Sequence, residues 1–144
     1  MYALYTKSLS GITVSWFATQ EDCLRYVQLG RVSKYKYVHI SKQKPLYFSQ
    51  AFEWSEELQD VVVNIEKAKE IKLTEIRNLR NSYFDKADRI FSKALETDDE
   101  DKRALAVSLK QRLRDVTDLS LPDNENLLMS FVPEVFQEMD LIVI

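Results

Sequence analysis

The order of hydrophobic and polar positions changes character about one third of the way along the chain. Three early runs are rich in β-branched and aromatic residues, as is typical of strands. These predicted strands cover residues 2–6, 12–17 and 35–40. The segment Ser8-Leu9-Ser10-Gly11 between the first two has turn composition, which predicts a hairpin.

One short helix is expected within this first third. Thr19 is a suitable N-cap, Asp22 lies in the first turn, and Gly30 stands where a left-handed C-cap would end a helix over residues 20–29. A fourth strand is expected over residues 46–49, after a proline. The pattern therefore predicts a β-β-α-β-β lobe.

A helical period replaces alternation after residue 55. No Gly or Pro occurs from residue 56 to about residue 95, and Ser55 is placed to cap a long helix. An apolar stripe with spacings of three and four residues marks its buried face. The stripe consists of Val62, Ile65, Leu73, Ile76, Tyr83, Ala87, Ile90 and Ala94.

A second helix is expected to follow and to pack against the first. Thr97 and Glu100 have the spacing of a capping box, and the acidic residues 98–101 favour a helix N-terminus. Its predicted buried face is made of Ala104, Leu105, Leu109, Leu113 and Val116. The two helices should form a helical hairpin.

The chain after Pro122 is predicted to be an irregular tail, interrupted by Pro133. Its apolar residues 141–144 are expected to join the N-terminal sheet as a strand or, alternatively, to dock on a partner. The predicted fold class is α+β. The expected parts are an α+β lobe (1–54), a helical hairpin (55–119) and the tail (120–144).

Composition excludes several classes of function. The net charge of −3 gives no overall positive field, so nucleic acid is not an expected partner. Basic residues between 31 and 44 alternate with Tyr35 and Tyr37, which in a strand places lysines outward and aromatics inward. No secretory signal or membrane span is evident, which predicts a cytoplasmic protein.

Residues that could carry catalysis are sparse. His39 is the single histidine and lies in a strand pattern, while Cys23 is interpreted as a buried small hydrophobe. Gly11 and Gly30 do not form a phosphate-binding loop, and the acidic run 98–101 lacks the ligand spacing of a calcium loop. We therefore expect no enzyme activity, no cofactor and no metal site.

The helical hairpin resembles one known family. Residues 75–119 read EIRNLRNSYFDKADRIFSKALETDDEDKRALAVSLKQRLRDVTDL, which is similar to the C-terminal region of phage tail assembly chaperones, also called tail-fibre assembly proteins. The matching positions are Arg77, Arg80, Asn81, Asp88, Lys110, Gln111, Leu113, Arg114 and Asp115. Two positions depart from the family pattern. Arg89 stands where a tryptophan often follows the aspartate, and Phe131-Val132-Pro133 replaces a Trp-Pro.

The resemblance implies a chaperone that binds a phage tail-fibre protein in the host cytoplasm. Partner contacts are expected from aromatic residues of the lobe or tail, each of which could equally be core: Phe48, Phe52, Trp54, Phe131 and Phe136. Arg77, Arg80 and Arg114 are expected to meet Asp88, Asp115 or Asp118 and set the hairpin register. The alternatives are a structural tail or virion component and a small nucleic-acid-binding regulator. Homodimerisation is compatible with each.

Overall fold

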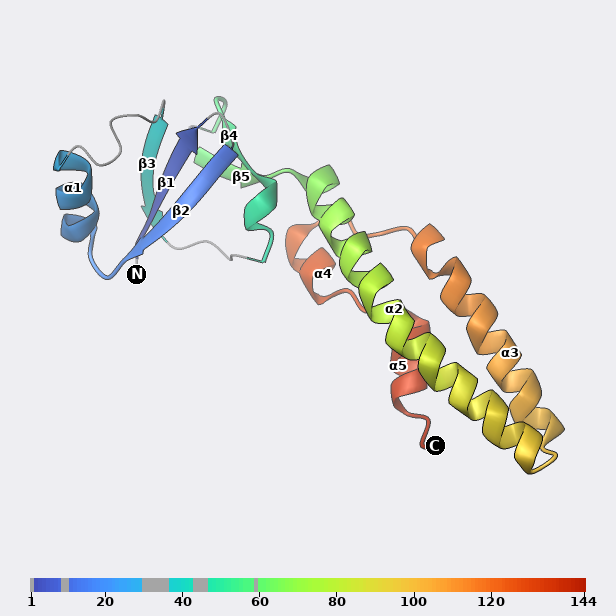
Figure 1. Cartoon of the computed structure of the whole chain (residues 1–144). Helices are drawn as coiled ribbons and strands as arrows, with labels where there is room; N and C mark the ends of the chain where they lie inside the picture. Colours follow the sequence, from blue (N-terminus) through green and yellow to red (C-terminus); the bar gives the residue numbers. More distant parts are fainter. Residues whose placement is uncertain (1, 9–10, 30–36, 43–46, 59) are drawn as a thin grey trace. The chain divides into compact units, whose positions relative to one another are not determined.

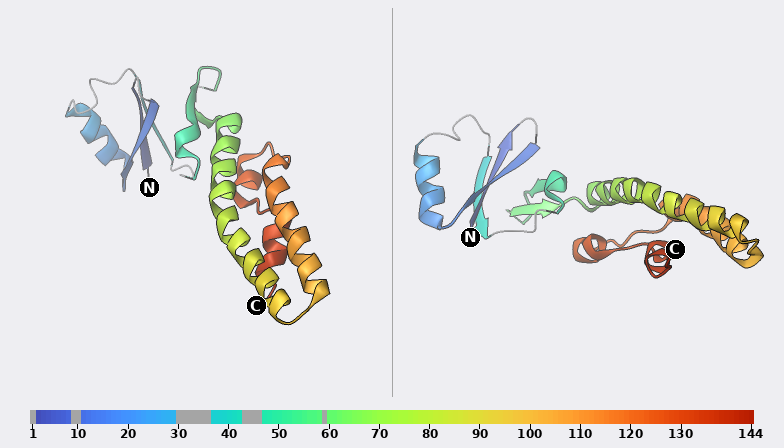
Figure 2. Two further views of the ribbon diagram at one scale, coloured as in Figure 1. Left: turned by 45° about the vertical axis from the view of Figure 1, so that its right-hand side comes forward. Right: turned by 60° about the horizontal axis from the view of Figure 1, so that its bottom comes forward.

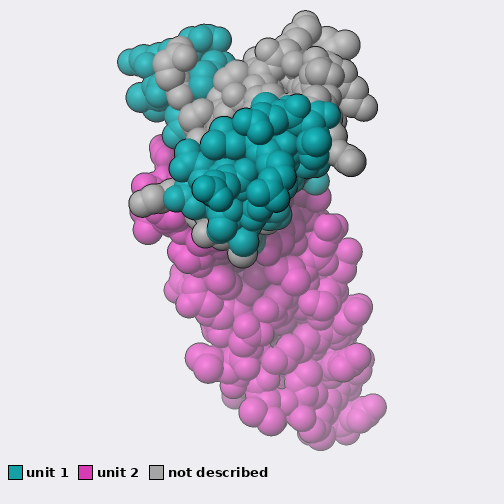
Figure 3. All heavy atoms as spheres, turned by 90° about the vertical axis from the view of Figure 1, so that its left-hand side faces the viewer, with its two compact units in different colours: residues 1–68 teal, residues 69–144 magenta. Residues whose placement is uncertain are grey.

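The computed structural model describes residues 2–8, 11–29, 37–42, 47–58 and 60–144. The chain divides into two compact units, residues 1–68 and 69–144, coloured separately in Figure 3. Strands and one short helix make up the first unit, and helices make up the second. The predicted α+β fold class is confirmed.

The first unit contains a three-stranded antiparallel sheet. Its strands are β1 (Tyr2–Ser8), β2 (Gly11–Phe17) and β3 (Tyr37–Lys42), in the order β2-β1-β3. In the register of β1, Leu4 lies opposite Ser15 on one side and Ile40 on the other. The predicted hairpin is confirmed in its strands, while residues 9 and 10 of its turn lie outside the described chain.

Alternate residues of β1 enter two different cores, as the period of a strand requires. Leu4 packs with Cys23 of α1 (Gln20–Gln28), which lies against the sheet in Figure 1. The neighbouring Ala3 and Tyr5 pack with Phe52 and Val61. Thr19 accepts a hydrogen bond from the Asp22 backbone N–H, so the predicted N-cap of α1 is confirmed.

Residues 47–63 differ from the expected structure. The described part of the predicted strand 46–49 is a turn followed by the short 3-10 helix η1 (Ser49–Ala51). A hairpin of β4 (Phe52–Ser55) and β5 (Asp60–Val63) then occupies the expected first turns of the long helix. The three consecutive valines of β5 explain the difference, because β-branched side chains favour a strand over a helix.

The long helix α2 spans Ile65–Glu96 and therefore begins about two turns later than predicted. Its first turn is capped by Asn64, whose side chain accepts a hydrogen bond from the Lys67 backbone N–H. The expected cap, Ser55, lies in β4 and instead accepts from the Leu58 backbone N–H. The prediction of Ser55 as the start of the helix was wrong.

Helix α3 (Glu100–Asp115) runs antiparallel beside α2, which confirms the predicted hairpin (Figure 2). Its N-cap is Asp99, which accepts from the Lys102 backbone N–H, so the capping box expected at Thr97 was wrong. That hydrogen bond lowers the pKa of Asp99. The link between the helices is completed by Asp98 in a left-handed conformation (φ 53°), which aspartate tolerates better than most residues.

The chain after α3 is more regular than expected. A 3-10 turn, η2 (Val116–Asp118), leads to two short helices, α4 (Glu125–Ser130) and α5 (Glu134–Asp140). Pro133 serves as the N-cap of α5, a position where a missing N–H costs nothing. Figure 2 shows α4 and α5 on one side of the hairpin.

Both helices of the hairpin and α5 share one core. Its buried members are Ile76, Ala87, Ile90, Ala106, Leu109, Leu113, Val116, Val135, Phe136 and Met139. The predicted apolar stripe of α2 is thus buried in the second half of the helix. On α3, Ala104 and Leu105 are exposed, and Ala106 takes their place on the buried face. Residues 141–144 belong to neither sheet of the described chain, so their assignment to a strand of the N-terminal sheet was wrong.

Candidate functional site

The five aromatic residues predicted as partner contacts lie in or against the two cores. Phe48 and Phe52 are buried in the first unit, and Phe136 is 1% exposed in the second. Trp54 and Phe131 are partly buried and pack against the cores of their units. Three of the five therefore serve as core residues, while Trp54 and Phe131 keep partly exposed side chains.

The residues that resemble the chaperone family are spread over the hairpin. Leu113 is buried, Arg77 and Asn81 are exposed, and the Arg80 guanidinium lies 5.9 Å from the centre of the Phe84 ring. On α3, Gln111 donates to Asp115 (3.1 Å) and Arg114 donates to Gln111 (3.1 Å).

The ion pair that joins the two helices differs from the expected one. Asp88 of α2 pairs with Lys110 of α3, in place of the predicted pairs with Arg77, Arg80 or Arg114. The Lys110 ammonium also lies 5.0 Å from the centre of the Phe91 ring. An ion pair with an exposed carboxylate contributes about 0–1 kcal/mol, so the hairpin register depends mainly on its apolar core.

Exposed apolar side chains concentrate in residues 119–144. Among the described residues, fifteen large hydrophobic side chains are exposed, and seven of them lie in this stretch. These seven are Leu119, Leu127, Met129, Val132, Leu141, Val143 and Ile144. This stretch supplies nearly half of the exposed large apolar side chains, which makes residues 119–144 candidates for partner contact.

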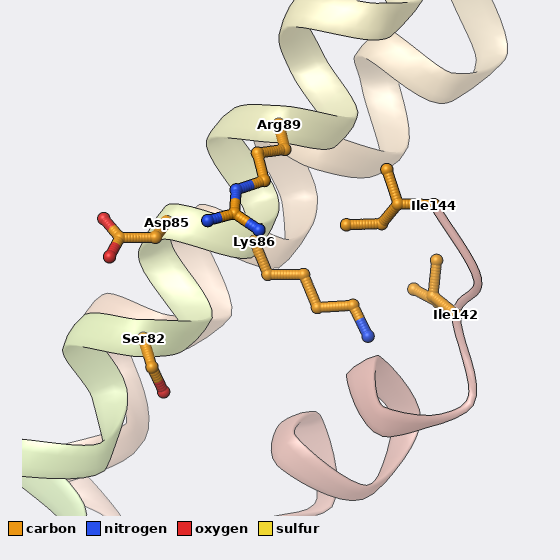
Figure 4. Close-up of a pocket in the computed structure, with 6 residues that line it drawn as sticks. All are labelled: Ser82, Asp85, Lys86, Arg89, Ile142 and Ile144. Atoms are coloured by element: carbon orange, nitrogen blue, oxygen red, sulfur yellow. The ribbon is translucent and has the colours of Figure 1, made fainter.

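A groove separates residues 141–144 from α2, and we call it the tail groove (Figure 4). Its volume is about 460 Å³, and it is lined by Ser82, Asp85, Lys86, Arg89, Ile142 and Ile144. Figure 4 shows the Lys86 ammonium extending toward the two isoleucines, the Arg89 guanidinium lying over α2, and the Asp85 carboxylate pointing away. One wall of the tail groove is therefore cationic and the other apolar.

A smaller hollow of about 100 Å³ lies on the other side of the same segment. Ile90 and Lys93 of α2, Lys102 and Leu105 of α3, and residues 142–144 line it. Within 141–144, exposure alternates, because Leu141 (83%) and Val143 (94%) face outward while Ile142 packs against the core. Ile142 is therefore the residue of this segment that faces the core.

Contacts between α2 and α5 hold this segment in place. The Tyr83 ring stacks on Phe136 with centroids 4.2 Å apart, and its hydroxyl donates to the Asp140 carboxylate (3.0 Å). The Lys86 ammonium donates to the Met139 carbonyl oxygen, which also accepts from the Ile142 backbone N–H (3.2 Å). These bonds position Ile142 and Ile144 opposite the cations of α2.

Partial burial, the hydrogen bond to Asp140 and the charge of Asp140 all raise the pKa of Tyr83. A raised pKa means that the folded state prefers the neutral phenol. The contribution of Tyr83 to folding stability is therefore complete below the unfolded pKa of about 10 and is lost as pH rises beyond it.

We expect Tyr83→Phe to lower the free energy of unfolding by about 1 kcal/mol or less at neutral pH and to reduce the loss of stability at alkaline pH. Urea unfolding of both proteins at neutral and alkaline pH tests this. An equal alkaline loss in the variant would contradict it.

Several groups around the tail groove lack partners within the described part of the chain. The exposed side chains of Arg89 and Lys93 make no hydrogen bond or ion pair there. The backbone N–H groups of Val143 and Ile144 likewise make no hydrogen bond to other described residues. The site can therefore offer cations, backbone donors and apolar side chains at once.

The sequence carries one signal for this site. Arg89 was noted only as a departure from the family pattern, although its spacing from Lys86 and Lys93 places all three on one flank of α2. Ile142 and Ile144 lie beside α2 of the same chain, which is neither of the two placements expected for residues 141–144. Their contact with α2 depends on the packing of α5.

Metal ligands and a reactive thiol are two further kinds of site to consider in the described chain. Its residues contain no cluster of three or more His, Cys, Asp or Glu side chains able to hold a metal ion. Cys23 is buried, and burial followed by the charge of Asp22 raises its pKa, which disfavours the reactive thiolate. None of the described helices combines the length and apolar character needed to cross a membrane.

Comparison with known proteins gives no relative for this chain. It matches no family model, no curated protein and no solved structure.

Proposed function

We propose that this protein is a phage tail-fibre assembly chaperone that binds the fibre protein in the host cytoplasm without catalysis. The observation that carries the proposal is the concentration of exposed apolar side chains in residues 119–144, supported by a helical hairpin. A surface of this kind can cover apolar parts of an unassembled client. The likeness of residues 75–119 to the chaperone family supplies the identity of the client.

Binding energy alone would drive such a cycle. A chaperone that binds the unassembled fibre more tightly than the trimer stabilises the unassembled form and is released when trimerisation buries its binding surface. The exposed residues Leu141 and Val143 are suited to this role, because they can pack on a client without unfolding the chaperone.

Co-expression with the tail-fibre protein encoded beside this chain tests the proposal. We expect soluble, trimeric fibre and co-purification of the two proteins only when this chain is present. Soluble trimeric fibre in its absence would contradict the proposal. Recovery of the chain from finished virions would instead support a structural tail component.

A further inference from the structure

We infer that the tail groove and the smaller hollow beside it together bind an extended, acidic and apolar segment of a partner protein, which adds to residues 142–144 as a neighbouring strand. The inference rests on the proposed function only for the source of that segment, the fibre protein. The chemistry of the segment follows from the charge, the backbone groups and the apolar side chains around the groove.

The side chains of α2 that face residues 142–144 carry positive charge. Lys86, Arg89 and Lys93 follow one another at spacings of three and four residues and line the two hollows beside residues 142–144. Lys86 is engaged by the Met139 carbonyl, but Arg89 and Lys93 have no partner in the described chain. The carboxylate that lines the tail groove, Asp85, points away from it (Figure 4). The complementary ligand is therefore anionic.

The backbone that follows α5 has N–H groups available to a partner. Leu141 ends α5 as its helical C-cap, and in residues 142–144 beyond it the N–H groups of Val143 and Ile144 make no hydrogen bond within the described chain. An extended segment with unused backbone groups binds another extended segment by strand addition. Because consecutive N–H groups of an extended backbone point to opposite sides, an added strand accepts a hydrogen bond from one of these two groups.

Val143 and Ile144 offer apolar side chains for contact with a partner. Val143 is 94% exposed, and Ile144 is partly exposed at the edge of both hollows. A strand paired with this segment projects alternate side chains to opposite faces. A partner with apolar residues on one face and carboxylates on the other can contact Val143 and reach Arg89 and Lys93 together.

Peptide binding tests the inference without the fibre protein. The probe is a fluorescein-labelled peptide of alternating valine and glutamate, compared by fluorescence anisotropy with a valine–lysine peptide of equal length. We expect the wild-type chain to bind the glutamate peptide and not the lysine peptide, with affinity that falls as salt is added. Absence of binding, or equal binding of both peptides, would overturn the inference.

Two pairs of variants localise the binding. The double variant Arg89→Glu/Lys93→Glu should lower the affinity for the glutamate peptide by about tenfold or more, because two attractive charge interactions become repulsive. Arg77→Glu, at an exposed arginine of α2 that does not line the groove, should leave affinity unchanged. Val143→Asp should also weaken binding, whereas Leu58→Asp, at an exposed leucine of the first unit, should not. Equal effects within either pair would overturn the assignment to this groove.

The same variants separate this inference from the proposed function. If the fibre protein co-purifies with the wild type and with the groove variants alike, the tail groove is not its binding site and the chaperone proposal stands. If the peptide binds the groove but the fibre protein does not co-purify, the chaperone proposal fails and the site remains. A dimer that Val143→Asp dissociates would show that a second copy occupies the segment, which would overturn the choice of partner.

Discussion

Replacing Phe136 with alanine is expected to lower the free energy of unfolding of the unit 69–144 by about 3–5 kcal/mol. Phe136 is 1% exposed and lies in the core shared by α2, α3 and α5, with its ring stacked on Tyr83. Alanine removes that packing and leaves a cavity that the surrounding helices fill only in part. Loss of α5 packing should also release residues 141–144 from α2.

The measurement for Phe136 is urea unfolding followed by far-ultraviolet circular dichroism, which reports mainly the long helices. The matched control is Leu141→Ala, at a neighbouring position that is 83% exposed, where the change should stay within about 0.5 kcal/mol. If Phe136→Ala kept the wild-type stability but lost its partner, Phe136 would be a contact residue, as its aromatic character suggested.

Replacing Phe52 with alanine should destabilise the first unit by a similar amount, about 3–5 kcal/mol. Phe52 is buried between the two small sheets, and its ring meets Tyr5 edge to face with centroids 5.9 Å apart. This unit is small and its sheets share few large side chains, so one cavity removes a large part of its core. Partial unfolding of the first unit at room temperature is an expected consequence.

Tryptophan fluorescence makes this measurement specific to the first unit. Both tryptophans of the chain, Trp16 and Trp54, belong to residues 1–68 and pack in the same core as Phe52. The fluorescence transition of Phe52→Ala should move to lower urea, while the circular dichroism transition of the helices should stay in place. The control is Leu24→Ala, at an exposed position of α1. A joint shift of both transitions would show that the two units unfold together.

Much of the fold followed from local pattern. Runs of β-branched and aromatic residues identified β1 and β2, and Thr19 marked the start of α1. The absence of Gly and Pro together with a helical period identified α2 and α3. Each of these signals lies within one element, so it can be read without knowing what the element packs against.

The boundaries were less predictable. The residues of β5 fit either a strand or the first turns of a helix by apolar spacing, and their pairing with β4 decided for the strand. The Asp99 cap of α3 was missed because Thr97, Asp98, Asp99 and Glu100 all suit a helix start. The choice depended on how the chain turns between α2 and α3, where Asp98 is left-handed.

The candidate site was the least visible in the sequence. Aromatic character selected Phe48, Phe52 and Phe136 as contacts, yet the same character makes them the best core residues. Composition alone does not separate the two roles, because burial depends on neighbours that are distant in the chain.

The sequence by itself determined the α+β class, the hairpin of β1 and β2, and the helical hairpin of α2 and α3, because residue composition and the local period of apolar positions specify them. Only the tertiary structure decided which apolar residues are covered. Packing of α5 on α2 buries Phe136 and leaves Val143 exposed, and it brings residues 142–144 beside Arg89. That juxtaposition joins residues more than fifty positions apart, and contacts of that range depend on the closure of the whole core, which no local pattern encodes.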